Sequence, residues 1–301
     1  MNKMISMTKR NCLVFLKDKS SVFFSLLSML IVLMLTGVFL GEMNVDSIVN
    51  VLAEYGGERD AVLDEENARH MVQYWTLAGL MVVNSLTVTL TVIGTMVTDK
   101  ADHKLKSFYT APVSKFVVAV SYIVAAVIIG FFFCVLTLAG YLAYILMTGG
   151  EMLSFAPMIK VLGLTLINVM LFSTIMYLIA LFVKSNSAWG GIATVIGTLV
   201  GFLGAIYVPV GSLPAGVVKV LKCLPILHST SLMRKAMCQD SIAETFTNVP
   251  TEVLEVYREE MGIDVVIKSN VMSDELQLLF LGICGMITLV VIAVAAKKKE
   301  R

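Results

Sequence analysis

The sequence predicts an all-α integral membrane protein with six transmembrane helices, and three observations carry this prediction. Of 301 residues, 57% are hydrophobic and only 15% are charged, against roughly 25% charged residues in an ordinary soluble domain. The apolar residues form long continuous runs rather than the alternating pattern of a membrane β-barrel. Because unpaired backbone groups are costly in lipid, such runs are expected to cross the bilayer as helices. Helices packed side by side share one core, so we expect a single domain over residues 1–301.

Six runs are long enough to cross a hydrocarbon core about 30 Å thick, which takes about 20 helical residues. The expected spans are residues 22–40, 71–97, 116–147, 158–183, 189–208 and 276–296. The third is overlong and contains Gly130 and Gly140, so a tilt, a kink or an interfacial portion is expected there. The first run is long enough to remain as a span, and no cleavable signal peptide is expected.

The distribution of charge predicts the orientation. With the N-terminus inside, the inner segments hold 14 Lys and Arg against four Asp and Glu, and the rest of the chain holds nine against 18. This asymmetry follows the positive-inside rule and predicts that both termini are cytoplasmic. The expected extracellular loops are therefore about residues 41–70 and 209–274.

The first 20 residues favour a basic amphipathic helix on the inner membrane surface. Apolar side chains such as Met4, Met7 and Phe15 mix with five basic residues, which are Lys3, Lys9, Arg10, Lys17 and Lys19. Such a composition suits a helix that lies in the interface next to anionic lipid. The alternative is a solvated, positively charged N-terminus.

The outer region after the fifth span is divided by prolines. Proline opens helices well and interrupts them when inside, so the pieces are expected to be short helices, the last of which runs from Pro225 to Arg234 and Lys235. They are too short to span and suit re-entrant or interfacial helices in the outer leaflet. The residues that mark this segment are Pro209, Pro214, Pro225 and Arg234.

Two spans carry stripes of polar or small residues. In the second span the stripe comprises Asn84, Thr87, Thr91 and Thr98, with Gly94 between them; in the fifth it comprises Gly190, Thr194, Gly197, Gly201 and Gly204. Small and hydroxylated residues allow close helix packing, which is one interpretation of both stripes. The other is the wall of a translocation path, for which the candidates are Asn84, Thr87, Thr91 and Thr194.

The sequence gives little support for an enzyme, a metal site or a proton-coupled carrier. The chain has no Gly-Lys dipeptide and so no P-loop for ATP hydrolysis. It also has no Cys/His metal cluster, and no ionisable residue near a span centre that could serve as a proton relay. Glu65, Glu66 and Arg69 resemble a motif of intramembrane proteases, but the spacing is one residue short, so a solvated acidic loop is the preferred interpretation. The sequence leaves open whether Cys223 and Cys238 of the outer region form a disulfide.

Three features occur in a characteristic order along the chain. They are the six spans, an inner block TDKADHKLKSFYTAPVSK at residues 98–115 that ends in Pro-Val-Ser, and the outer series Leu213-Pro214, Pro225 and Arg234 before the last span. In this order they resemble the permease subunits of ABC transporters of the exporter-like type 2 group, the ABC-2 family, over essentially the whole chain. The sequence departs from the family pattern at His103 and Lys104, where a Gly-Thr pair usually stands.

The resemblance implies that the inner block is a coupling helix that contacts an ATP-binding subunit. A short helix from about Asp99 to Tyr109 is expected, with Asp near its N-terminus to suit the helix dipole, and Pro112 is expected to end it. Its apolar side chains would fill a groove on the partner, and its lysines would meet acids or lipid phosphates. The residues expected at this contact are Asp99, Lys100, Asp102, His103, Lys104, Leu105, Phe108 and Tyr109. The alternative is an ordinary positively charged loop.

The resulting hypothesis is a permease subunit, without catalytic residues, cofactor or metal of its own, that exports an amphipathic or hydrophobic substrate such as a drug, peptide or lipid. ATP and magnesium are expected on two copies of a separate ATP-binding subunit. A second permease copy or paralogue and membrane lipids are the other expected partners, and no nucleic acid is expected. The expected location is a bacterial plasma membrane. The alternatives are a membrane sensor or scaffold that transports nothing, and the intramembrane hydrolase considered above.

Overall fold

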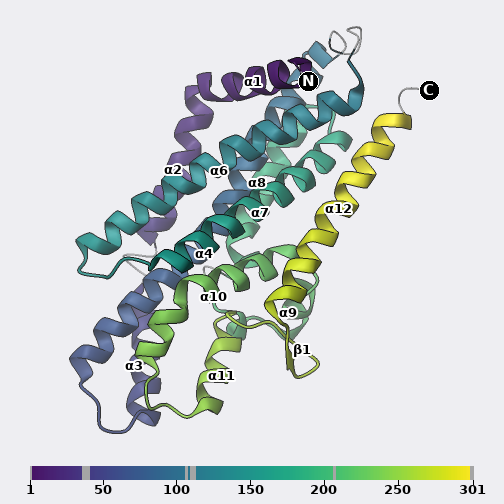
Figure 1. Cartoon of the computed structure of the whole chain (residues 1–301). Coiled ribbons are helices and arrows are strands. Elements are labelled where there is room, and N and C mark those ends of the chain that lie inside the picture. The colour runs from purple at the N-terminus through teal and green to yellow at the C-terminus, as the bar shows by residue number, and fades with distance from the viewer. Residues whose placement is uncertain (1, 36–40, 106–107, 109–112, 206–207, 299–301) are drawn as a thin grey trace.

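The structure is a computed structural model of the whole chain, and it describes all residues except 1, 36–40, 106–107, 109–112, 206–207 and 299–301. The helices form an elongated bundle with two distinct ends (Figure 1). Both termini, α1 (Asn2–Lys17) and the C-terminal end of α4 (Ala61–Ala101) lie at one end, which we call the N/C end. The opposite end, which we call the far end, holds α3 (Gly41–Tyr55) and α11 (Thr251–Glu260).

The remaining elements connect these two ends. The long helices are α2 (Lys19–Leu35), α6 (Lys115–Met147), α7 (Phe155–Phe182), α8 (Asn186–Leu203) and α12 (Asp274–Lys298). Between α8 and α12 the chain forms η2 (Val210–Ser212), α9 (Ala215–Leu221), α10 (Pro225–Thr245), α11 and a small antiparallel hairpin of β1 (Val266–Ile267) and β2 (Asn270–Val271).

Helix α4 is the centre of the bundle. Every residue from Met71 to Leu86 is buried, because α3, α6, α7, α8 and α10 all pack around this helix. A helix that is apolar on all sides belongs in such a position. The packing is close at Gly130 of α6, where a Cβ would lie 2.8 Å from the Val169 side chain on α7 and 3.1 Å from that of Thr89 on α4. The glycine therefore allows three helices to meet, and α6 is one continuous helix through it.

The outer helices have the opposite pattern, with large apolar side chains on the outside. On α12, Leu279, Met286 and Val290 are each more than half exposed, a pattern that is stable in lipid but not in water. Within the described part of the chain, five helices are long and apolar enough to cross a membrane, namely α4, α6, α7, α8 and α12. They correspond to the last five expected spans.

The expected first span, residues 22–40, is only partly described. Helix α2 begins at Lys19 and is 17 residues long to Leu35, about 25 Å at 1.5 Å per residue. Residues 36–40 lie outside the described part of the chain, so this span stays a prediction over its full length.

Helix α4 extends beyond the expected second span at both ends. Helix α4 begins ten residues before Met71, because the Asp60 carboxylate caps its first turn by accepting from the backbone N–H of Val62 at 3.0 Å. At the other end α4 continues through Val97 to Ala101. The expected start of the short inner helix at Asp99 is wrong, since Asp99 occupies the last turn of α4. Within the expected range, Lys104, Leu105 and Phe108 are helical.

At the far end the prolines act as expected, since Pro209, Pro214 and Pro225 stand at the starts of η2, α9 and α10. The length expected for the last piece is wrong. Helix α10 does not end near Arg234 but continues to Thr245, 21 residues in all, because it packs on α4, α7 and α12. It is long enough to span but too polar, with buried residues that include His228, Ser231 and Arg234.

Candidate functional site

The chain reverses direction directly after α4, at the N/C end. Asp102 caps the helix by donating its backbone N–H to the carbonyl of Thr98 at 2.9 Å. His103 then adopts a left-handed conformation with φ of 61°, which is uncommon for a residue other than glycine. Asp102, His103 and Lys104 are exposed at this reversal. These three residues form what we call the loop tip.

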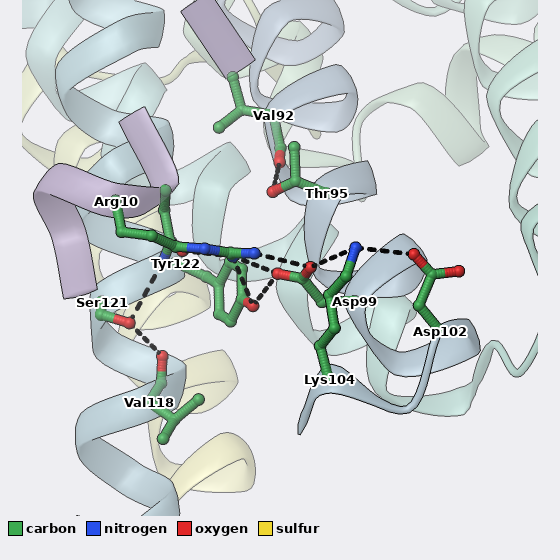
Figure 2. Close-up of polar contacts among 10 residues, drawn as sticks. Arg10, Val92, Thr95, Asp99, Asp102, Lys104, Val118, Ser121 and Tyr122 are labelled. Atoms are coloured by element: carbon green, nitrogen blue, oxygen red, sulfur yellow. Dashed lines mark hydrogen bonds and ion pairs between the residues drawn. The ribbon is translucent and has the colours of Figure 1, made fainter. Parts of the chain in front are cut away.

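Just below the loop tip, the Asp99 carboxylate is buried and paired. Arg10 of α1 donates two guanidinium N–H groups to it, the Nη2 group at 2.9 Å to Oδ1. The hydroxyl of Tyr122 on α6 donates to Oδ2 at 2.5 Å. Figure 2 shows the three side chains converging from three different helices. Lys104 Nζ lies 3.9 Å from Asp99 Oδ1. Such a fork of charge-assisted hydrogen bonds is strong and directional, so it fixes α1 against the ends of α4 and α6.

Two further contacts attach α1 to the same place. The Arg10 guanidinium lies 5.5 Å from the ring centroid of Phe108, within cation–π range. Asn11 Nδ2 donates to Ser121 Oγ on α6 at 3.3 Å. The amphipathic helix expected at the N-terminus is thus present, and Arg10, one of the four basic residues of α1, points into the protein rather than to its surface.

The residues expected at the ATPase contact divide into two groups. Asp99 is buried as described, and Lys100 Nζ donates to the carbonyl oxygens of Leu181 and Val183, at 3.0 and 2.5 Å, at the C-terminus of α7. Leu105 is buried and Phe108 is half-buried. Only the loop tip is exposed among the expected residues that the structure describes, and Tyr109 lies outside the described part.

Arg10 and Tyr122 were not among the residues expected at this site. Arg10 resembles the surrounding lysines of a basic amphipathic helix, and Tyr122 lies inside the third apolar run. Two signals were available, because arginine suits bidentate recognition of a carboxylate better than lysine does, and a buried tyrosine hydroxyl usually has a partner.

A pocket of about 430 Å³ adjoins Asp99 between α1, α2, α4 and α8. Thr91, Gly94 and Thr98 line it from α4, and Trp189 lines it from α8. Gly94 is required for this arrangement, because a Cβ there would lie 2.7 Å from Nε1 of Trp189. The pocket therefore depends on a close approach of α4 and α8.

The four residues expected to line a path lie in different surroundings. Asn84 is buried and donates to Thr137 Oγ1 on α6 at 2.5 Å, which is the packing role. Thr87 is half-buried and bonds to a carbonyl of its own helix. Thr91 lines the pocket, and Thr194 is exposed on α8, where its hydroxyl donates to the carbonyl of Gly190 at 3.0 Å. Of the four, only Thr91 lies on the described pocket.

The far end is organised around Arg234. Its guanidinium is fully buried, stacks 3.9 Å from the ring centroid of Trp75 on α4, and donates to the carbonyl oxygens of Met261 and Ala205 at 2.9 and 2.6 Å. Burial lowers the pKa of Arg234 to about 9, so the group stays charged at neutral pH. Among the described residues no carboxylate lies within ion-pair distance of it. Arg234 thus connects α4, α10, the end of α8 and the end of α11.

The features that suggested a hydrolase are on the surface. Glu65 pairs with Arg69 at 3.0 Å one turn away on α4, and both are about half exposed, as expected of a solvated acidic segment. Within the described residues no three His, Cys, Asp or Glu side chains could hold a metal ion. Cys223 is exposed, Cys238 is buried, and both are free thiols.

Comparison with known families gives one clear result. Residues 58–297 match the family described as ABC-2 family transporter protein. This range covers well over half of the chain and extends from just before α4 into the last turn of α12. No curated protein matches the chain.

Proposed function

The chain belongs to the ABC-2 family of transporter proteins, and we propose that it is the permease subunit of an ABC exporter for an amphipathic or hydrophobic substrate. It is a multi-pass membrane protein without ATPase motifs, and the family pairs such permeases with ABC ATP-binding subunits. The proposed complex contains two of these subunits and a second permease copy or paralogue, in a bacterial plasma membrane.

The observation that carries the proposal is the construction of the N/C end. An exposed loop tip stands on the ion pair between Arg10 and the buried Asp99, directly at the end of the most buried of the five candidate spans. A load applied to the loop tip is therefore transmitted to α1, α4 and α6 together. We propose that the ATP-binding subunit contacts Asp102, His103 and Lys104, that ATP binding moves this joint, and that the movement opens the route between the two permeases.

A photocrosslinking experiment tests this contact. A photoreactive phenylalanine analogue at His103 should crosslink to the ATP-binding subunit in native membranes. Asn248 is the matched control, because it is also exposed and also has a positive φ, 64° against 61°, but follows α10 at the far end. Capture of an ATP-binding subunit from position 103 and not from 248 supports the proposal. Its capture from neither position would contradict the coupling role and favour a sensor or scaffold.

The proposed topology places the N/C end in the cytoplasm and the far end outside, with α9 and α10 dipping into the outer leaflet. Native Cys223 tests this directly because it is exposed and follows Lys222, which pairs with Glu259 of α11 at the far end. An impermeant thiol reagent should label intact cells at Cys223, and C223S should abolish this labelling. A cysteine introduced at His103 in the C223S background should react only after the cells are permeabilised. Labelling of that cysteine in intact cells would overturn the orientation.

The proposed substrate path includes the pocket beside Asp99. Replacing Thr91 by phenylalanine should change which substrates are exported while assembly and basal ATPase activity remain, because its side chain lines the pocket. Replacing Asn84 by leucine is the contrasting variant. It removes the bond to Thr137 and should lower the amount of folded protein first. If the T91F and N84L variants both lose folded protein, the polar stripe of α4 serves helix packing, and the proposed path is wrong.

A further inference from the structure

The C-terminus of α7 is capped by a side chain from α4. The last carbonyl groups of a helix have no partner within the helix itself. Lys100 Nζ donates to the carbonyl oxygens of Leu181 and Val183, at 3.0 and 2.5 Å, and a cation at this position also suits the helix dipole. Lys100 lies in the last turn of α4, just before Asp102 of the loop tip. Its ammonium group therefore joins the end of α7 to the base of the loop tip.

The segment after α7 leads directly into α8. Helix α7 ends at Phe182 and α8 begins at Asn186, so residues 183–185 are the whole connection, which we call the α7–α8 turn. Ser185 Oγ caps α8 by accepting from the backbone N–H of Ala188 at 3.3 Å. Helix α4 also contacts this side, because Thr98 Oγ1 donates to Asn186 Oδ1 at 3.3 Å. The last turn of α4 is thus bonded on both sides of a very short connection, and a displacement of the α7–α8 turn has to displace the start of α8.

Helix α8 has few other attachments. Within α8 only Trp189, Val200 and Gly201 are buried, and its main packing partner is α4. An element with so few buried contacts can be displaced with a small loss of free energy. Residues from the first two turns of α8 line the pocket beside Asp99, together with residues of α4. The position of α8 relative to α4 therefore sets the width of this pocket.

We propose that Lys100 is a positioning residue that makes the α7–α8 turn move together with the loop tip, so that movement of the loop tip changes the width of the pocket beside Asp99. The inference rests on the proposed function, which takes the loop tip as the contact of the ATP-binding subunit and the pocket as part of the substrate path. Lys100 does not line the pocket, so it acts through the α7–α8 turn rather than on the substrate. This role differs from that of Arg10 and Tyr122, which bond Asp99 to α1 and α6.

The test follows the width of the pocket through the reactivity of a cysteine placed in it. Thr95 lines the pocket, so T95C is combined with C223S, which removes the exposed native thiol. The assembled complex is treated with N-ethylmaleimide, with and without a non-hydrolysable ATP analogue, and alkylation at position 95 is followed by mass spectrometry of the peptide. Coupling between two sites commonly changes an equilibrium by a factor of about 5 to 150, so the analogue should change the alkylation rate about fivefold or more.

Two variants remove bonds between α4 and the segment that follows α7. K100M keeps the apolar stem of the side chain and removes the ammonium donor, so most of the change caused by the analogue should disappear. K100R still donates to both carbonyl oxygens and should respond like the wild type. T98A removes the bond to Asn186 and should reduce the response in part. Because Thr98 is exposed, T98A should fold normally, and it tests the proposal even if K100M does not fold.

The matched control is S185A, which removes a helix cap from the same turn without touching α4. K100M and S185A should both lower the melting temperature, because each removes a cap, but S185A should keep the full response to the ATP analogue. A purely structural role of Lys100 predicts the same response in both. Wild-type responses in K100M and T98A would overturn the proposal. So would an equal loss of response in S185A, or an alkylation rate in the wild type that does not depend on the analogue.

Photocrosslinking at position 103 distinguishes a failure of this inference from a failure of the proposed function. K100M should still capture the ATP-binding subunit from position 103, because the loop tip itself is unchanged. Capture combined with a lost response of the pocket supports the positioning role, and capture combined with a normal response contradicts it. If the wild type captures no ATP-binding subunit, the proposed function fails first, and this inference fails with it.

Discussion

Removal of Arg10 should loosen the joint at the N/C end and uncouple the permease from ATP hydrolysis. The Asp99 side chain is 3% exposed and that of Arg10 is 33% exposed. Removal of one partner of a fully buried ion pair costs about 3 to 5 kcal/mol because the other charge remains buried. Solvent screens the exposed third of Arg10, and Lys104 at 3.9 Å can partly replace it. We therefore expect R10Q to destabilise the protein by about 2 kcal/mol.

Replacing Asp99 should destabilise the protein less than replacing Arg10. In D99N the guanidinium remains partly solvated and the amide oxygen still accepts a hydrogen bond, so we expect a loss of about 1 kcal/mol. The double variant should then lose about 2 kcal/mol, which gives a coupling of about 1 kcal/mol between the two residues. The assay is thermal unfolding in detergent, where 1 kcal/mol corresponds to about 2 °C in a chain of this size.

The functional measurement uses the assembled complex. R10Q and D99N should both lower transport and substrate-stimulated ATPase activity while the basal ATPase activity remains. The control is K9Q, which removes the same charge from the neighbouring exposed residue of α1. If the two losses of stability simply add, and both variants transport as well as K9Q does, the ion pair has no coupling role and the reasoning fails.

Three further outcomes are expected. Replacing Arg234 by methionine should lower the free energy of unfolding by about 3 kcal/mol or more and expose the outer region to proteolysis, because two carbonyl acceptors lose a buried charged donor. An R234M variant that resists protease as well as the wild type would contradict this. Burial alone would raise the pKa of Asp264, but hydrogen bonds from Arg258 and Lys235 lower it overall. The ionised Asp264 carboxylate therefore stabilises the fold fully above the unfolded pKa of about 3.9, and this stabilisation is lost as the pH falls through the folded pKa. The wild-type protein should accordingly have a lower free energy of unfolding at pH 3 than at pH 7, and the difference between the two pH values should be smaller in D264N. G94A should push α4 away from α8 and lower the free energy of unfolding by about 1 to 3 kcal/mol, whereas G190A should be tolerated because there is open space around Gly190. Equal melting temperatures of G94A and G190A would refute the close contact between Gly94 and Trp189.

Composition and charge distribution alone determined the class of this protein. Long apolar runs have to be helices in lipid because their backbone groups have no other partners, and the last five expected spans correspond to α4, α6, α7, α8 and α12. The order of motifs was enough to recognise the family that residues 58–297 match. Prolines also marked the starts of the outer helices correctly, because the ring restricts backbone torsion locally.

Tertiary structure decided where helices end and which polar residues meet. Hydropathy records where the apolar run stops, but α4 continues to Ala101 because Arg10 and Tyr122, 89 and 23 residues away in sequence, stabilise its last turn. Likewise α10 continues past Arg234 because α4 and the end of α11 supply partners for its buried side chains. The roles of Asp99 and Asn84 depended on the same kind of long-range contact. A side chain's neighbours along the chain say whether it can be helical, but only the packed bundle brings a carboxylate to its guanidinium.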